Sequence, residues 1–272
     1  MSRALVLVAL VAAAARADAP RFRFATGETL SYHLVQTTQV VETAPDEKTN
    51  KPVETKSTTK VDLIRKWKVS DVDAKGVATV EMTIAEMRWE RKSGDEEDVF
   101  DSSKPDDLNK SEMAKHVGPV LAVLRVDPLG KVVEVKESKV GPAARFETEL
   151  PFKFVLPATT GPAWDRTFTL QLDPPLGTGE KYATTQKYQA GDVKNELLPV
   201  RVATEIKDLP ATSAEQIPLL PHLAEGTVYF HAATGRYYAA RLKVQKELKN
   251  HQGDGSSYKF TSTYVEDLVL AK

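Results

Sequence analysis

The stretch VATVEMTIAEMRW, residues 77–89, decides the fold of this chain, because apolar and polar side chains alternate along it. Val80, Met82 and Ile84 fall on one face, and glutamate and threonine lie between them. This period of two is typical of a strand in an antiparallel sheet that packs one face and leaves the other in water. The sequence therefore predicts a mainly β protein.

Similar runs lie on the N-terminal side of this stretch. Residues 29–41, TLSYHLVQTTQVV, alternate in the same way, and residues 61–69 form a hairpin with residues 77–89 about a turn at residues 71–76. Residues 44–60 are rich in Thr, Lys, Glu and Pro and carry no apolar stripe, which predicts a long exposed hairpin tip or loop.

Two short helices are expected between strands. A capping serine, a proline and two aspartates predict a helix over residues 105–116. A second helix begins near Thr212, but Pro218 and Pro221 limit it to one or two turns.

The segments after these two helices resemble one another. Residues 120–135 and 227–242 each read as a strand, a small turn with a glycine followed by a basic residue, and a second strand. We interpret this likeness as an internal duplication, with a first β half at residues 18–150 and a second at residues 151–272, packed as one domain. The predicted fold is an antiparallel curved sheet or a barrel-like assembly of these two halves, with one or two short helices.

A curved sheet encloses a concavity, and alternate side chains of its strands line it. Aromatic and methionine residues are the candidates for such a lining; the alternative is that they fill an ordinary core. The candidate lining residues are Trp67, Met82, Trp89, Phe168, Tyr188 and Tyr229.

Residues 1–17 read as a secretory signal peptide. Arg3 precedes the apolar run of residues 4–15, and Ala15-Arg16-Ala17 supplies an A-x-A cleavage site. The run is shorter than the roughly 18 apolar residues that a transmembrane helix needs. We therefore expect cleavage after Ala17, export to the periplasm or the medium, and a mature chain without a membrane-spanning segment.

Composition narrows the partners of the mature chain. Losing Arg3 and Arg16 leaves 35 of the 37 Lys and Arg against 38 Asp and Glu, well mixed along the sequence. No basic stripe is present, so nucleic acid is not expected as a partner. The sequence has no cysteine, hence no disulfide and no acceptor for a lipid anchor.

Motifs for catalysis and metal binding are missing from the sequence. The five histidines show no H-x-x-x-H or H-E-x-x-H spacing, and there is neither a G-x-S-x-G motif nor a cysteine nucleophile. The acidic run at residues 95–98 lacks the alternating donors and the glycine of a calcium loop. We predict no catalytic residue, no metal site and no cofactor.

Five short turn and strand motifs lie along the mature chain. They are G-E-x-L-x-Y at residues 27–32, L-R-V-D-x-x-G-K at 124–131, G-x-x-W at 161–164, E-G-x-V-x-F at 225–230 and the T-G-R turn at 234–236. In this order, after a signal peptide, the chain resembles a family of exported bacterial proteins of unknown function. The resemblance implies an envelope protein and marks no functional residue.

Two classes of function follow from these features. The first is a binding or carrier protein of the cell envelope, not an enzyme, for an apolar or lipid-like small molecule. The alternative is a structural or interaction protein that engages an envelope protein through its sheet edges. An enzyme with dispersed carboxylates comes third. A carrier requires an apolar cavity, an adaptor requires a filled core with an exposed apolar patch, and an enzyme requires two buried acidic groups in one cleft.

Overall fold

The computed structural model describes residues 19–46, 48–49, 51–104, 106–107, 112–174 and 176–270, so the predicted signal peptide and its cleavage site lie outside the described residues. Within these ranges the chain is built from antiparallel strands with a few short helices. The strands are β1 (Thr29–Pro45), β2 (Pro52–Val72), β3 (Ala78–Ser93), β4 (Glu96–Asp101), β5 (Val120–Val126), β6 (Val132–Ser138), β7 (Ala163–Leu172), β8 (Glu180–Ala190), β9 (Leu197–Ile206), β10 (Glu225–His231), β11 (Arg236–Lys249) and β12 (Ser257–Val269). The helices are η1 (Glu112–His116), α2 (Arg145–Thr148), α3 (Ser213–Gln216) and η2 (Ile217–His222).

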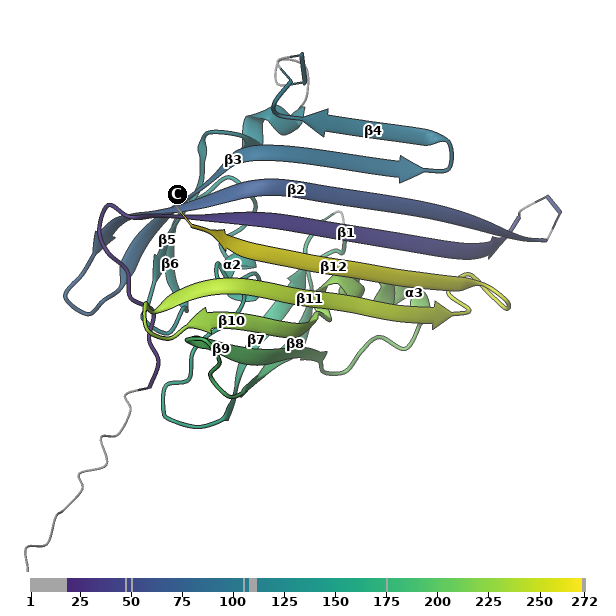
Figure 1. The fold of residues 1–272 in the computed structure, drawn as a ribbon. Coiled ribbons are helices and arrows are strands. Elements are labelled where there is room, and N and C mark those ends of the chain that lie inside the picture. Colours follow the sequence, from purple (N-terminus) through teal and green to yellow (C-terminus); the bar gives the residue numbers. More distant parts are fainter. Residues whose placement is uncertain are drawn as a thin grey trace, which may run out of the picture.

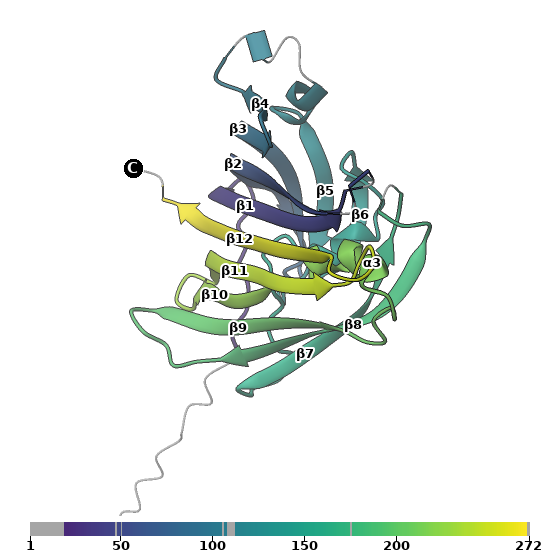
Figure 2. The same ribbon diagram turned by 90° about the vertical axis from the view of Figure 1, so that its right-hand side faces the viewer.

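The strands form one 12-stranded sheet. Eleven of them follow the order β6-β5-β3-β2-β1-β12-β11-β10-β9-β8-β7, and β4 pairs with the C-terminal part of β3, past the part that pairs with β5. The first and last strands meet in its middle, where β1 pairs with β12 from Ser31–Val269 to Thr43–Ser257. Figure 2 shows that both ends of the sheet, β5–β6 and β7–β8, curl toward the same side. The predicted mainly β, curved antiparallel fold is confirmed, and β6 and β7 remain separate edges, so the sheet is open rather than a closed barrel.

The alternation in β3 places its apolar face on the concave side. Val80 and Met82 are buried at 0% and 8% exposure. A register shift pairs Ile64 with Glu86 but Arg65 with Ile84, which inserts one extra residue into β3. Beyond this bulge Met87 lies on the same face as Met82 and Ile84.

The prediction of a loop at residues 44–60 is wrong in part. β1 and β2 stay paired as far as Pro45 and Pro52, so the two strands take up most of this range. Backbone hydrogen bonds extend this ladder without an apolar stripe, and its threonines and valines suit an extended chain. The far end of the hairpin is exposed, as expected.

The predicted helices are short. Of the helix expected over residues 105–116, the described part contains the 3₁₀-helix η1, while residue 105 and residues 108–111 lie outside the described residues. The second helix agrees with the prediction: the Thr212 hydroxyl accepts a hydrogen bond from the Glu215 amide at the start of α3, and the chain continues into the proline-containing η2.

Residues 139–156, which we call the plug, pack into the concavity after β6. Phe146, Phe152 and Phe154 of the plug are at most 5% exposed and belong to the main core cluster, together with inward-facing residues of both ends of the sheet. The Phe152 ring lies 5.9 Å from that of Trp67 on β2 and 6.0 Å from that of Tyr237 on β11. Figure 1 shows α2, which belongs to the plug, behind the central strands.

The segment before β1 joins two distant hairpins. The Phe22 amide donates to the Pro128 carbonyl in the β5–β6 turn at 2.8 Å, and the Arg23 amide donates to the Gly235 carbonyl in the β10–β11 turn at 3.0 Å. Phe22 is buried, with its ring centroid 5.2 Å from that of Phe152. The segment around Phe22 therefore links the β5–β6 turn and the β10–β11 turn to the C-terminal end of the plug.

The two halves share an order of elements. β1, β2, β3, β5 and β6 pair in succession, with η1 before the fourth strand, and β7 to β11 pair in succession, with α3 and η2 before the fourth strand. The duplication itself stays a prediction.

We expect Gly130→Ala to destabilise the protein by at least about 1 kcal/mol more than Gly94→Ala. Both glycines have a positive φ, +85° and +59°, so in both variants the alanine must adopt a left-handed backbone that lowers stability. A Cβ at Gly130 would additionally lie 2.6 Å from Phe22 Cε2, whereas nothing lies within 4 Å at Gly94. Urea denaturation measures the difference, and equal losses would contradict the packing of Phe22 on this turn.

Candidate functional site

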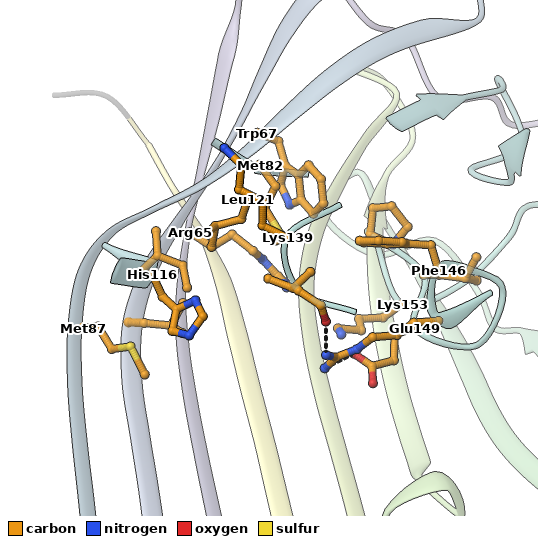
Figure 3. Close-up of a pocket in the computed structure, with 16 residues that line it drawn as sticks. Arg65, Trp67, Met82, Met87, His116, Leu121, Lys139, Phe146, Glu149 and Lys153 are labelled. Atoms are coloured by element: carbon orange, nitrogen blue, oxygen red, sulfur yellow. Dashed lines mark hydrogen bonds and ion pairs between the residues drawn. The ribbon is translucent and has the colours of Figure 1, made fainter. Parts of the chain in front are cut away.

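The plug does not fill the whole concavity. A cavity of about 470 Å³ remains between the plug and strands β2, β3 and β5, shown in Figure 3. Its size is within the range of about 300–1,000 Å³ that is usual for small-molecule sites. Its wall is mostly apolar, with Leu63, Trp67, Met82, Ile84, Leu121 and Phe146 among the lining residues.

One end of this cavity is polar and opens to solvent. Lys139, Arg145 and Glu149 line it and have side chains that are 54%, 45% and 46% exposed. Arg145 is fixed by an ion pair to Glu149 at 3.0 Å and by a hydrogen bond to the Val140 carbonyl at 2.6 Å. The cavity thus has a charged mouth and an apolar interior.

A buried ion pair forms part of the wall. Arg65 of β2 reaches across β1 and donates through Nη2 to Oε1 of Glu266 on β12, a carboxylate that is 0% exposed. The Glu266 Oε2 accepts from the hydroxyls of Tyr237 at 2.6 Å and Tyr264 at 2.8 Å. These four side chains are hydrogen-bonded to one another, so the charges of Arg65 and Glu266 are matched inside the sheet.

The surroundings shift the ionisation of this group. Burial and the Glu266 carboxylate raise the pKa of Tyr237 and of Tyr264 well above 10.0. Burial and Glu266 also raise the pKa of the neighbouring Tyr32. Burial opposes the charge of Arg65, but Glu266, Tyr264 and Tyr237 together outweigh burial and raise the pKa of this guanidinium.

Lys153 of the plug lies between the buried pair and the mouth. Its backbone has a left-handed φ of +65°, and its Nζ lies 4.8 Å from the centroid of the Tyr264 ring. Among the described residues Lys153 forms no ion pair. Burial and then the Arg65 guanidinium lower the pKa of this ammonium from its ordinary value of 10.5.

Two further donors in this wall lack acceptors. Nε of Arg65 and Nε1 of Trp67 are buried and have no hydrogen-bond partner among the described residues. Buried polar groups are normally paired, so these two N–H groups are exceptions that remain open to an acceptor.

A second cavity, of about 360 Å³, lies against the other side of the plug. It shares Arg145, Glu149, Leu150 and Lys153 with the first cavity and extends along the inward faces of β11 and β12. His222 lines this second cavity, and burial lowers the pKa of its imidazole. Lys153 therefore borders both spaces.

The structure separates the six residues predicted to line a concavity. Trp67 and Met82 line the first cavity, and Phe168 lines the second. Tyr188 is buried at 2% exposure and stacks on Trp164 at 5.5 Å, as core. Trp89 and Tyr229 line neither of these two cavities.

The charged residues of the site were missed from the sequence. Arg65 carries a signal that would have revealed it, because it interrupts the apolar alternation of Leu63, Trp67 and Val69 on β2. Lys153 and Glu266 carry no such signal, since their neighbours come from distant strands.

Comparison with known proteins gives only remote similarity. No protein-family profile and no curated protein matches the chain. A structure entitled "Lipid-protein interactions in lipovitellin" aligns with a TM-score of 0.49 and 10% identity, covering 91% of this chain and 26% of that one. DynF from the dynemicin biosynthesis pathway of Micromonospora chersina aligns with a TM-score of 0.21 and 9% identity, covering 94% of this chain and 88% of that one.

The chain spans about a quarter of the lipovitellin chain that it matches. At these TM-scores neither structure carries an inference about what this protein does. Over the described residues, no helix is long and apolar enough to cross a membrane. The same ranges contain no group of three His, Asp or Glu side chains placed to hold a metal ion.

Replacing Glu266 tests the buried ion pair. We expect Glu266→Gln to lower the free energy of unfolding by about 3 kcal/mol, because the Arg65 charge stays in the wall without its counter-ion. The control is Asp267→Asn on the same strand, whose ion pair with Arg241 at 2.5 Å is nearly half exposed, and we expect about 1 kcal/mol or less. Urea denaturation of both variants measures this, and similar losses would refute the buried pairing.

The shifted tyrosines predict a loss of stability at alkaline pH. An unfolded tyrosine ionises near pH 10, whereas folded Tyr32, Tyr237 and Tyr264 hold their protons to higher pH. The unfolded state then binds fewer protons, so the free energy of unfolding falls as pH rises above about 10. Tyrosinate absorbance and circular dichroism should show these three side chains ionising together with unfolding. Ionisation of all 8 tyrosines near pH 10 in a folded protein would contradict this.

Proposed function

We propose that this protein is an exported binding or carrier protein for an apolar or lipid-like small molecule, held in the cavity between the plug and strands β2, β3 and β5. The cavity itself carries the proposal, because it is concave, largely apolar and bounded by packed elements. Burying an apolar ligand here would release water from the wall and favour binding by about 25 cal/mol per Å² of apolar area.

The framework of the cavity supports a preformed site. Trp67 and Leu121 in its wall are each 1% exposed and belong to the main core cluster. The opposite wall is anchored by Phe146 and Leu150 of the plug, both 5% exposed. A preformed site costs little ordering on binding, which favours affinity.

Export is part of the proposal. It is supported by the signal peptide predicted at residues 1–17 and by the resemblance to exported bacterial proteins. A protein of the periplasm or the medium with an apolar cavity is suited to carry a poorly soluble molecule through water.

The test is to express the full chain, leader included, in a bacterium and to record a native mass spectrum of the gently purified product. We expect a chain beginning at Asp18 and an excess mass that solvent extraction releases as a small apolar molecule. An intact chain that retains residues 1–17 would contradict export. An interaction protein would be favoured if the mass stays that of the bare protein even after apolar probes are added, and if a protein partner is captured from the envelope.

A bulky residue in the wall locates the bound molecule. Ile84 is a half-buried lining residue on β3, and we expect Ile84→Trp to reduce the occupancy of the co-purified molecule at least about tenfold by filling its space. The control is Val99→Trp on β4, where the side chain is 41% exposed. Unchanged occupancy in a folded Ile84→Trp variant would place the ligand elsewhere.

A further inference from the structure

Among the described residues, the Lys, Arg and Glu side chains at this cavity form ion pairs, with Lys153 as the exception. Arg65 is paired with the buried Glu266, Arg145 with Glu149 at 3.0 Å, and Lys139 with Glu137 at 3.2 Å. Lys153 lines the same cavity, and its ammonium forms no ion pair with a carboxylate of the described residues.

The plug holds this cation in place. Phe152 and Phe154, on either side of it, are 1% and 0% exposed and pack in the main core. The left-handed φ of +65° at Lys153 is a conformation that a side-chain-bearing residue rarely adopts. The chain therefore turns at Lys153 between two buried anchors, and this turn directs the side chain to the Tyr264 ring on the concave face.

The contacts of Lys153 compensate its charge only in part. The face of the Tyr264 ring attracts the ammonium but accepts no strong hydrogen bond from it. The nearby Arg65 and Arg145 guanidiniums repel it, while the Glu266 and Glu149 carboxylates that attract it are already engaged by those two arginines. With Nε of Arg65 and Nε1 of Trp67 also unpaired in the described structure, the wall presents three N–H donor groups without an acceptor, and its lysines and arginines outnumber its carboxylates.

We propose that Lys153 is the head-group contact for an anionic amphiphile, a single-chain carboxylate or phosphate whose tail lies against Trp67, Met82 and Ile84. This inference rests on the proposed function and names the ligand class of the same cavity. The anion accepts charge-assisted hydrogen bonds from the Lys153 ammonium, which has three donors and no ion-pair partner in the described structure. The half-exposed side chains at the mouth keep the head near water, while the apolar wall takes the tail.

Calorimetric titration of the delipidated full-length mature protein with a matched probe set tests this. The probes are dodecanoate, dodecyl phosphate, dodecanol and dodecyltrimethylammonium, each below its micelle concentration. We expect both anions to bind at least about tenfold more tightly than the alcohol, and the cation to bind more weakly than the alcohol. The ratio between the two anions distinguishes a carboxylate from a phosphate head.

Lys153→Met removes the charge and keeps a flexible side chain of similar length. We expect it to weaken dodecanoate binding at least about tenfold and to leave dodecanol binding within about twofold. The control is Lys66→Met, which removes the same charge from an exposed position on β2 next to Arg65, and it should change neither affinity. Retained dodecanol binding also shows that the Lys153→Met variant is folded.

Two failures are distinguishable. If no probe binds, or if Ile84→Trp leaves probe binding unchanged, the cavity is not the ligand site and the proposed function fails. If dodecanol binds as tightly as dodecanoate, or if Lys153→Met weakens both equally, the cavity binds apolar molecules but Lys153 is not a head-group contact.

Discussion

The fold depends on pairing the two ends of the chain in the middle of one sheet. β1 and β12 are paired along thirteen residue pairs, and we call this pairing the seam. The ion pair from Arg65 to Glu266 crosses the seam on the concave face of the sheet. Glu266 is fully buried, so its charge is tolerable only while a cation and two tyrosine hydroxyls face it. Separating β1 from β12 would expose the backbone hydrogen-bonding groups of both strands and leave the Glu266 carboxylate without its cation. The pairing of β1 with β12 and the polar cluster around Glu266 therefore stabilise each other.

An open sheet with so central a seam needs support at its edges. The plug supplies it, because Trp164 of β7 donates to the Val155 carbonyl at 2.8 Å and Arg166 donates to the carbonyls of Glu147 and Thr148 at the end of α2. The segment around Phe22 ties the turns of the two halves to the same plug. The concavity is therefore divided by a packed segment, and the cavities are the space that this segment leaves.

Local pattern predicted the strands well, because a period of two in β3 and β1 is visible within a dozen residues. At residues 44–60 it predicted an exposed hairpin tip or loop, which is right about the exposure but underestimates how far backbone pairing extends the two strands. It also could not reveal that Ser31 faces Val269, since that pairing joins the two ends of the chain. The predicted boundary between the two halves, after residue 150, falls within the plug, and the place of this segment in the wall of a cavity depends on packing against strands that are remote in sequence.

The position of Lys153 follows from this division of the concavity. An exposed loop lysine would turn to water, but the aromatic neighbours of Lys153 are core residues, so the backbone between them cannot withdraw without losing their burial. Phe152 and Phe154 thus hold this cation, which forms no ion pair in the described structure, beside the cavity, and the Tyr264 ring adds a contact of its own. Core packing therefore keeps one ammonium beside an apolar wall, and this arrangement is the basis of the proposed contact with an anionic head group.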